Sequence, residues 1–93
     1  MRITDHPERH RYTLDVDGQE AAEIVYHLRG ADKIEFEHTE VKKEFEGQGL
    51  ASRIAAFAFD DARKRGLKVI PSCSYIQRFL AKHPEYEDLV AQR

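Results

Sequence analysis

The sequence predicts a single α/β domain of the α+β kind, in which helices pack against a mixed sheet of antiparallel meander strands plus one parallel crossover. Apolar and polar residues alternate along residues 11–41, and the tight-turn signal Asp17-Gly18 separates two of the alternating runs. Apolar residues at helical spacing follow in residues 50–65, and a short apolar run, residues 67–70, comes after them. A strand, a helix and a second strand in this order predict a right-handed parallel crossover.

Length and composition restrict the class of protein. A chain of 93 residues predicts one domain, residues 1–93, with an extended lead-in at residues 1–9. Fifteen basic side chains nearly balance 17 acidic ones, so we expect neither nucleic acid nor a membrane as a partner. We expect neither a signal peptide nor a membrane span, because no apolar run approaches the length of about 20 residues that a membrane span needs. The single cysteine and the lack of paired metal-ligand spacing predict a cytoplasmic protein with no metal.

The first third of the chain is predicted to form an antiparallel meander. Residues 11–16 and 22–28 alternate like half-buried strands on either side of the first turn. A third strand covers residues 34–41, where Ile34 and Phe36 share the apolar face. His38 is in phase with both residues, so we expect its ring to point inward.

The remainder is predicted to be mostly helical. A long helix runs from Leu50 to about residue 65, and Gly66 is a natural stop after it. Its apolar residues at helical spacing are Leu50, Ile54, Phe57, Ala58 and Ala62. The short strand 67–70 ends at Pro71, a second helix begins near Tyr75, and a third runs from residue 84 to about 91. Because ligands of such sheets lie at the carboxyl ends of the strands, we expect residues 41–51 and 71–75 to meet at one crevice.

The segment Gly47-Gln48-Gly49-Leu50-Ala51 joins the third strand to the long helix. Glycines at a helix start let the backbone turn tightly and approach a ligand closely. The unpaired first N–H groups and the helix dipole make this end an anion site. The segment lacks the Gly-Lys-Ser/Thr of a P-loop and the third glycine of a dinucleotide fingerprint. We therefore expect a phosphate-bearing ligand at these amides, with plain helix capping as the alternative.

With these residues placed, the sequence resembles the GCN5-related N-acetyltransferase (GNAT) superfamily, whose acyl-coenzyme A signature is Gln/Arg-x-x-Gly-x-Gly/Ala. Residues 46–51 match it at Gly49 and Ala51 and depart from it at Glu46. A closer resemblance, over about residues 12–90, is to the very small single-domain branch of that superfamily. The pieces that carry it are His38-Thr39-Glu40-Val41, the glycine segment, Pro71-Ser72-Cys73-Ser74-Tyr75 and His83-Pro84-Glu85-Tyr86.

The resemblance implies a compact GNAT-like domain that moves an acetyl group from acetyl-coenzyme A (acetyl-CoA) to an amine, on a small molecule or on a protein lysine or N-terminus. It also implies a monomer or weak homodimer. The coenzyme-binding residues that it implies are Val41, Lys42, Lys43, Gly47, Gln48, Gly49, Leu50, Ala51 and Ser52. The alternative is a non-catalytic acyl-CoA-binding or interaction module.

Four residues are candidates for catalysis. Cys73 lies between a strand end and a helix start, so we expect a partly exposed thiol with a lowered pKa. It either accepts the acetyl group or donates a proton to the coenzyme thiolate, unless it is a buried core residue. Tyr75 is the rival proton donor, because the family commonly uses a tyrosine just after this strand; a core aromatic is the alternative. His38 is a candidate base together with Glu40, against a hydrogen-bonded core histidine.

Overall fold

A computed structural model describes residues 1–91 and shows one sheet with its five strands in chain order. Four strands form an antiparallel meander, and the fourth pairs in parallel with the fifth. The strands are β1 Arg2–His6, β2 Arg11–Val16, β3 Gln19–Arg29, β4 Lys33–Val41 and β5 Lys68–Pro71. The helices are α1 Leu50–Lys64 and α2 Ser74–Lys82, with short 3-10 helices η1 Pro7–Arg9, η2 Lys43–Phe45 and η3 Pro84–Leu89. This mixed sheet with one parallel crossover confirms the predicted fold class.

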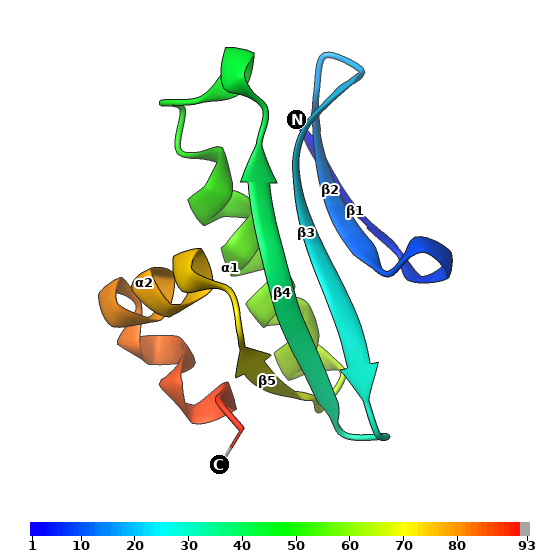
Figure 1. Cartoon of the computed structure of the whole chain (residues 1–93), viewed down its shortest axis with the longest axis vertical. Coiled ribbons are helices and arrows are strands. Elements are labelled where there is room, and N and C mark those ends of the chain that lie inside the picture. The colour runs from blue at the N-terminus through cyan, green and yellow to red at the C-terminus, as the bar shows by residue number, and fades with distance from the viewer. Residues whose placement is uncertain (92–93) are drawn as a thin grey trace.

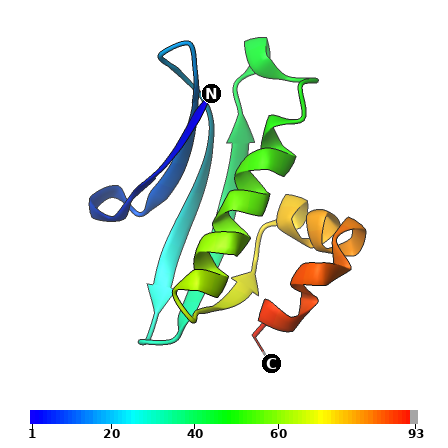
Figure 2. The same cartoon turned by 180° about the vertical axis from the view of Figure 1, so that it is seen from behind.

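The helices are arranged around one face of the sheet. α1 crosses that face, and α2 and η3 lie beside α1 beyond β5 (Figures 1 and 2). Figure 1 shows the opposite face of β1 to β4 without a helix over it. Among the described residues, no helix combines the length and the apolar character that crossing a membrane requires.

Alternation of residue type explains the strands, and a wide apolar stripe explains α1. The turn between β2 and β3 has positive φ at both central residues, 51° at Asp17 and 79° at Gly18, as the predicted hairpin turn requires. α1 buries six side chains, and three alanines among them let the helix lie flat on the sheet. These residues are Leu50, Ile54, Ala55, Ala58, Phe59 and Ala62. Phe57, which the spacing placed among the apolar residues, is instead 37% exposed and meets the edge of Tyr12.

A β-bulge in the middle of β4 changes which side chains face the helices. Tyr26 of β3 lies opposite Phe36, but the preceding residue of β3 lies opposite His38, so Glu37 has no partner. Two residues of β4 therefore oppose one of β3, and the inward alternation moves by one position. Ile34 and Phe36 are fully buried before the bulge, whereas His38 after it is exposed. The expectation that His38 points inward is therefore wrong.

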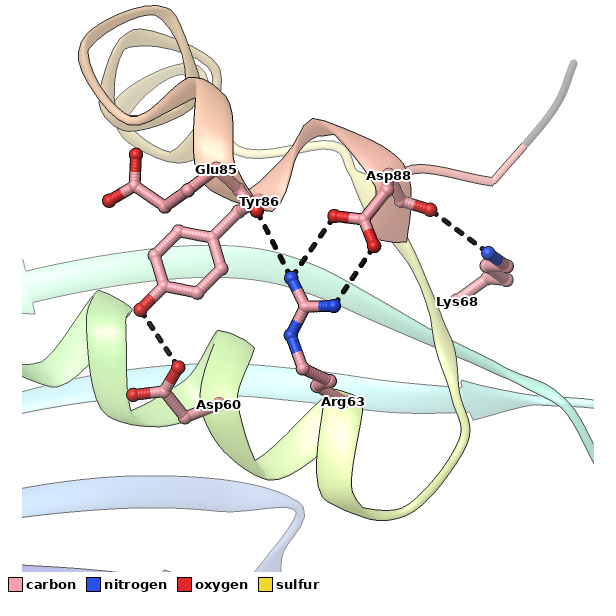
Figure 3. Close-up of polar contacts among 6 residues, drawn as sticks. All are labelled: Asp60, Arg63, Lys68, Glu85, Tyr86 and Asp88. Atoms are coloured by element: carbon pink, nitrogen blue, oxygen red, sulfur yellow. Dashed lines mark hydrogen bonds and ion pairs between the residues drawn. The ribbon is translucent and has the colours of Figure 1, made fainter.

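Aromatic stacking holds α2 and η3 against α1. The ring of Phe59 on α1 stacks on Phe79 of α2 at 5.6 Å and on Tyr86 of η3 at 5.2 Å between ring centroids. Polar contacts reinforce this packing from the solvent side (Figure 3). Arg63 donates two hydrogen bonds to the Asp88 carboxylate, at 2.9 and 3.0 Å, and the Tyr86 hydroxyl donates to a carboxylate of α1. The position of α2 relative to α1 is therefore set by several independent contacts.

A second polar cluster, also at the C-terminal end of α1, ties the helix to β1, β2 and β3. The Tyr12 hydroxyl donates to the Asp61 carboxylate at 2.7 Å, and Arg65 donates to the same carboxylate at 3.2 Å. Arg65 also pairs at 3.6 Å with Asp5, which accepts a 2.7 Å bond from the Tyr26 hydroxyl. Burial, followed by the hydrogen bond to Asp61, raises the pKa of Tyr12 well above its usual value.

The substitution Tyr12→Phe tests this cluster. We expect it to lower the free energy of unfolding by about 1–2 kcal/mol near neutral pH, because the buried Asp61 bond is lost. The folded pKa of Tyr12 lies above its unfolded pKa of about 10, so this stabilisation is full below that pH and declines above it. Urea unfolding of both proteins at neutral pH and at about pH 11 measures the difference, which should shrink at the higher pH. A difference that grows with pH would contradict this account.

Candidate functional site

The candidate site lies where β4 and β5 separate. Their pairing ends at Phe36 and Pro71. Beyond this point β4 continues to Val41, whereas the segment after β5 turns into α2. The Cys73 N–H donates to the Phe36 carbonyl at 3.1 Å, which is a last backbone contact across the gap. This opening is at the carboxyl ends of two parallel strands, where ligands of open sheets bind.

The N-terminus of α1 forms one wall of the opening. Gly47 and Gly49 have φ of 83° and 74°, in the left-handed region that favours glycine. Gly49 is the N-cap, and within the described residues no side chain caps this end. The first N–H groups of the helix therefore keep their donors free for an outside acceptor, next to the positive end of the helix dipole. A Cβ at either glycine would meet nothing within 4 Å, so both backbones border open space.

A hollow of about 200 Å³ connects this helix start to α2. Its lining residues come from the ends of β4 and η2, the glycine segment, the first turn of α1 and the start of α2. They are Val41, Phe45, Glu46, Gly47, Gly49, Leu50, Ala51, Ser52 and Tyr75. Six of the nine expected coenzyme-binding residues therefore lie around one space with Tyr75. Lys43 and Gln48 are exposed and do not line it, and Lys42 lies in a separate small hollow with Glu23 and Glu40.

Cys73 is the N-cap residue of α2 and lies next to this hollow rather than in its lining. Its side chain is 9% exposed, so the expected partial exposure of the thiol is wrong. The Sγ atom lies 3.5 Å from the Thr39 hydroxyl of β4. Burial alone would raise the pKa of the thiol. Hydrogen bonds from the Thr39 hydroxyl and from the backbone of Ile76 and Tyr75 outweigh it, so the pKa lies below its usual value, in the expected direction.

Tyr75 is half-buried at the first turn of α2. Burial raises the pKa of its hydroxyl above the usual value, although the nearby charge of Arg78 opposes this effect. The negative charge of an ionised Cys73 raises the pKa of Tyr75 further. The arrangement therefore favours a neutral phenol beside a thiol that ionises more readily than an ordinary cysteine.

The candidate bases lie elsewhere. The side chains of His38 and Glu40 are each 58% exposed and pair with each other at 3.3 Å. Because the bulge at Glu37 reverses the alternation, both project from the sheet face opposite α1. The expectation that His38 and Glu40 lie near the crevice is therefore corrected.

Thr39 is the site residue that the sequence reasoning missed. It is half-buried and occupies the inward phase that had been given to His38. A signal was present in the sequence: β-branched Thr39 and Val41 share one phase, and polar His38 and Glu40 share the other. This phase is opposite to that of Ile34 and Phe36, and a change of phase within one strand indicates a bulge.

Known proteins resemble this chain in sequence and in fold. A sequence profile of the GCN5-related N-acetyltransferase family matches residues 11–89. Protein NATD1 of Gallus gallus is 30% identical over 85 residues, which cover 90% of this chain and 77% of NATD1. A GCN5-like protein of Staphylococcus aureus, solved by NMR, has 28% identity and a TM-score of 0.75, with 99% of this chain and 89% of that chain covered.

The fold extends to more distant acetyltransferases. A GNAT family acetyltransferase of Elizabethkingia anophelis, solved with acetyl-CoA bound, has a TM-score of 0.60 at 16% identity. The similarity covers 77% of this chain and 50% of that chain. Because the family profile matches most of its length, the chain belongs to the GCN5-related N-acetyltransferase family. The family resemblance seen in its sequence is thereby confirmed.

The contact between Thr39 and Cys73 predicts a measurable pKa change. Thr39→Val keeps the shape of the side chain but removes the hydroxyl, so the pKa of Cys73 should rise. Titration of the thiolate ultraviolet absorbance measures it, with Cys73→Ala as the baseline, because the chain has one cysteine. Thr4→Val, on the opposite sheet face, is the matched control and should leave the titration unchanged. A pKa in Thr39→Val equal to that of the unmodified protein would contradict the assigned contact.

Proposed function

We propose that this chain is an acetyl-CoA-dependent N-acetyltransferase that moves an acetyl group to an amine. The observation that carries the proposal is that one hollow joins an uncapped helix N-terminus to Tyr75, with the Cys73 thiol beside it. A similar fold in the Elizabethkingia protein holds acetyl-CoA, and this supports the choice of coenzyme. The acceptor is an amine of a small molecule, a protein lysine or a protein N-terminus.

The amides at the start of α1 bind the pyrophosphate in this proposal. Their donors are free, the helix dipole favours an anion there, and glycine at positions 47 and 49 leaves room for close approach. Glu46 also lines the hollow and places an acidic group where the family signature has Gln or Arg. Its side chain is exposed, so water and salt screen its charge from the phosphates.

Cys73 is assigned as the nucleophile, because its pKa lies below the usual value and the thiolate is the nucleophilic form. Its sulfur attacks the acetyl carbonyl carbon, the bond from that carbon to the coenzyme sulfur breaks, and the neutral Tyr75 hydroxyl gives its proton to the departing thiolate. An amine then attacks the acetyl-cysteine, and the Cys73 thiolate leaves. The amine returns one proton to Tyr75, so the chain ends in its starting state.

A direct route uses the same residues differently. The amine attacks the thioester without a covalent intermediate, and Tyr75 or the Cys73 thiol protonates the coenzyme thiolate. A thiol with a lowered pKa is more often deprotonated and then has no proton to give, whereas Tyr75, whose pKa is raised, keeps its proton. Tyr75 is therefore the donor in this route as well. In either route the only cysteine works as a free thiol, which fits a reducing cytoplasmic environment.

A second function has one observation in its favour. Both expected bases, His38 and Glu40, face away from the hollow, and within residues 1–91 no other histidine or carboxylate except Glu46 lines it. A chain with a coenzyme-binding site and no general base beside it also fits a non-catalytic acyl-CoA-binding or interaction module. Binding of the coenzyme without its release in the presence of any amine would identify that module.

The proposed coenzyme-binding site at the start of α1 is tested by a pair of glycine substitutions. Gly49→Ala should weaken CoA binding about tenfold or more, because its Cβ enters the open space beside the α1 amides. Gly66→Ala is the matched control, since Gly66 has φ of 70° at the far end of α1 and suffers the same backbone strain, about 1–2 kcal/mol. Calorimetric titration with CoA measures both folded variants. Equal affinities of Gly49→Ala and Gly66→Ala for CoA would reject the proposed coenzyme-binding site.

The chemistry is tested by mass spectrometry after mixing the protein with acetyl-CoA. We expect an acetyl adduct on Cys73 that is discharged when an amine is added. Tyr75→Phe should slow the release of coenzyme about 100-fold while retaining binding, because it removes the proton donor. Full turnover by Cys73→Ala would remove the cysteine from the chemistry and leave the direct route.

A further inference from the structure

The connection between β5 and α2 consists of two residues, Ser72 and Cys73. Its backbone is tied to β4 by the hydrogen bond from the Cys73 N–H to the Phe36 carbonyl, at 3.1 Å. A side chain makes a second link to the same strand, because the Ser72 hydroxyl donates to the Glu35 carboxylate at 2.5 Å. Two consecutive residues of the connection are therefore tied to two consecutive residues of β4.

Glu35 is a firmly held carboxylate on the sheet face opposite α1. Ile34 and Phe36 on either side of it are buried under the helices, so Glu35 projects the other way. The Nε atom of Arg29 donates to its carboxylate at 2.7 Å, and the side chain is only 18% exposed. The hydrogen bond from Ser72, followed by the one from Arg29, holds the pKa of Glu35 below its usual value. The ionised carboxylate thus accepts two charge-assisted hydrogen bonds.

Strand β4 contacts this connection on both faces of the sheet. Glu35 holds Ser72 from the outer face, whereas the Thr39 hydroxyl lies 3.5 Å from the Cys73 sulfur on the inner face. Ser72 and Cys73 share one planar peptide unit, so a backbone shift at Ser72 also moves the Cys73 side chain. The bond from Ser72 to Glu35 therefore restrains the sulfur relative to Thr39, although Glu35 is on the far side of the strand.

We propose that Glu35 is a positioning residue for the Cys73 nucleophile and acts through its hydrogen bond with Ser72. Arg29 orients the carboxylate, and the carboxylate fixes Ser72, so that the sulfur stays beside the Thr39 hydroxyl and the first amides of α2. Glu35 lies outside the lining of the coenzyme hollow. The inference rests on the proposed function, because the position of the sulfur matters for acetyl transfer only where Cys73 takes up the acetyl group.

A purely stabilising ion pair is the rival account of Glu35, and Glu23 provides the matched control. The Glu23 carboxylate also accepts a 2.7 Å hydrogen bond from an arginine, Arg11, on the same sheet face. Its side chain is 17% exposed, against 18% for Glu35. Glu23 lies on β3, which β4 separates from β5 and from Cys73. Loss of either carboxylate should lower stability to a similar extent, but only loss of Glu35 should affect the thiol.

The test follows the Cys73 thiol in Glu35→Ala, Ser72→Ala, the double variant and Glu23→Ala. Ultraviolet titration measures the thiolate pKa, and mass spectrometry measures the rate at which acetyl-CoA acetylates the thiol. Glu35→Ala and Ser72→Ala should each raise the pKa, because the sulfur leaves its hydrogen-bond donors, and should slow acetylation about tenfold. The double variant should be no slower than either single variant, because both remove one contact.

Two further variants and a binding measurement isolate the effect. Glu35→Gln keeps an acceptor oxygen for Ser72 and should restore part of the pKa and part of the rate. Glu23→Ala should match the unmodified protein in both. Calorimetric titration should give the same CoA affinity for all of these proteins, since neither carboxylate lines the coenzyme hollow. Urea unfolding checks that each variant is folded.

Each outcome decides the role of Glu35. An unchanged thiolate pKa and acetylation rate in folded Glu35→Ala would overturn the positioning role and leave the proposed function intact. Equal changes in Glu23→Ala would overturn it too, because they would arise from lost stability. Additive effects in the double variant would overturn the action through Ser72. No acetyl adduct on the unmodified protein would reject the covalent route of the proposed function, and the titration, which needs no coenzyme, would still decide whether Glu35 positions the thiol.

Discussion

The bulge at Glu37 is the constraint on which the site depends. Before it, Ile34 and Phe36 point at α1 and build the core; after it, Thr39 and Val41 take the inward phase. Without the extra residue, Thr39 would lie on the face away from α2 and Cys73 would lose its hydroxyl partner. One unpaired residue in a strand therefore decides which side chains meet the thiol.

Packing of α2 determines the rest of the geometry. Phe59, Phe79 and Tyr86 stack across three elements, so the start of α2 has a defined position relative to the start of α1. This packing sets the distance between the two halves of the hollow, the amides of α1 and the side chain of Tyr75. A small chain can build such a site because backbone donors and helix ends supply most of it, with few functional side chains.

Part of the site could be predicted because it is local in the chain. Gly47 and Gly49 before a helical stripe indicate an anion-binding helix start, and both adopt the positive φ that favours glycine. Cys73 between a strand and a helix predicts a lowered thiol pKa, and backbone hydrogen bonds at the start of α2 contribute to it. The burial of that thiol was not predictable in the same way, since it depends on packing between β4 and α2.

The sequence by itself determined the order of β2 to β5 with α1 and α2, the parallel crossover and the family, because periodicity, turn residues and short motifs act over neighbouring positions. The predicted lead-in at residues 1–9 instead contains β1, which pairs with β2 in the sheet. Only the tertiary structure decided the faces of β4: His38 and Glu40 outward, Thr39 inward beside Cys73. The reason is physical. A bulge is a property of two paired strands, and the extra residue is visible only when Glu37 is set against β3 and found without a partner.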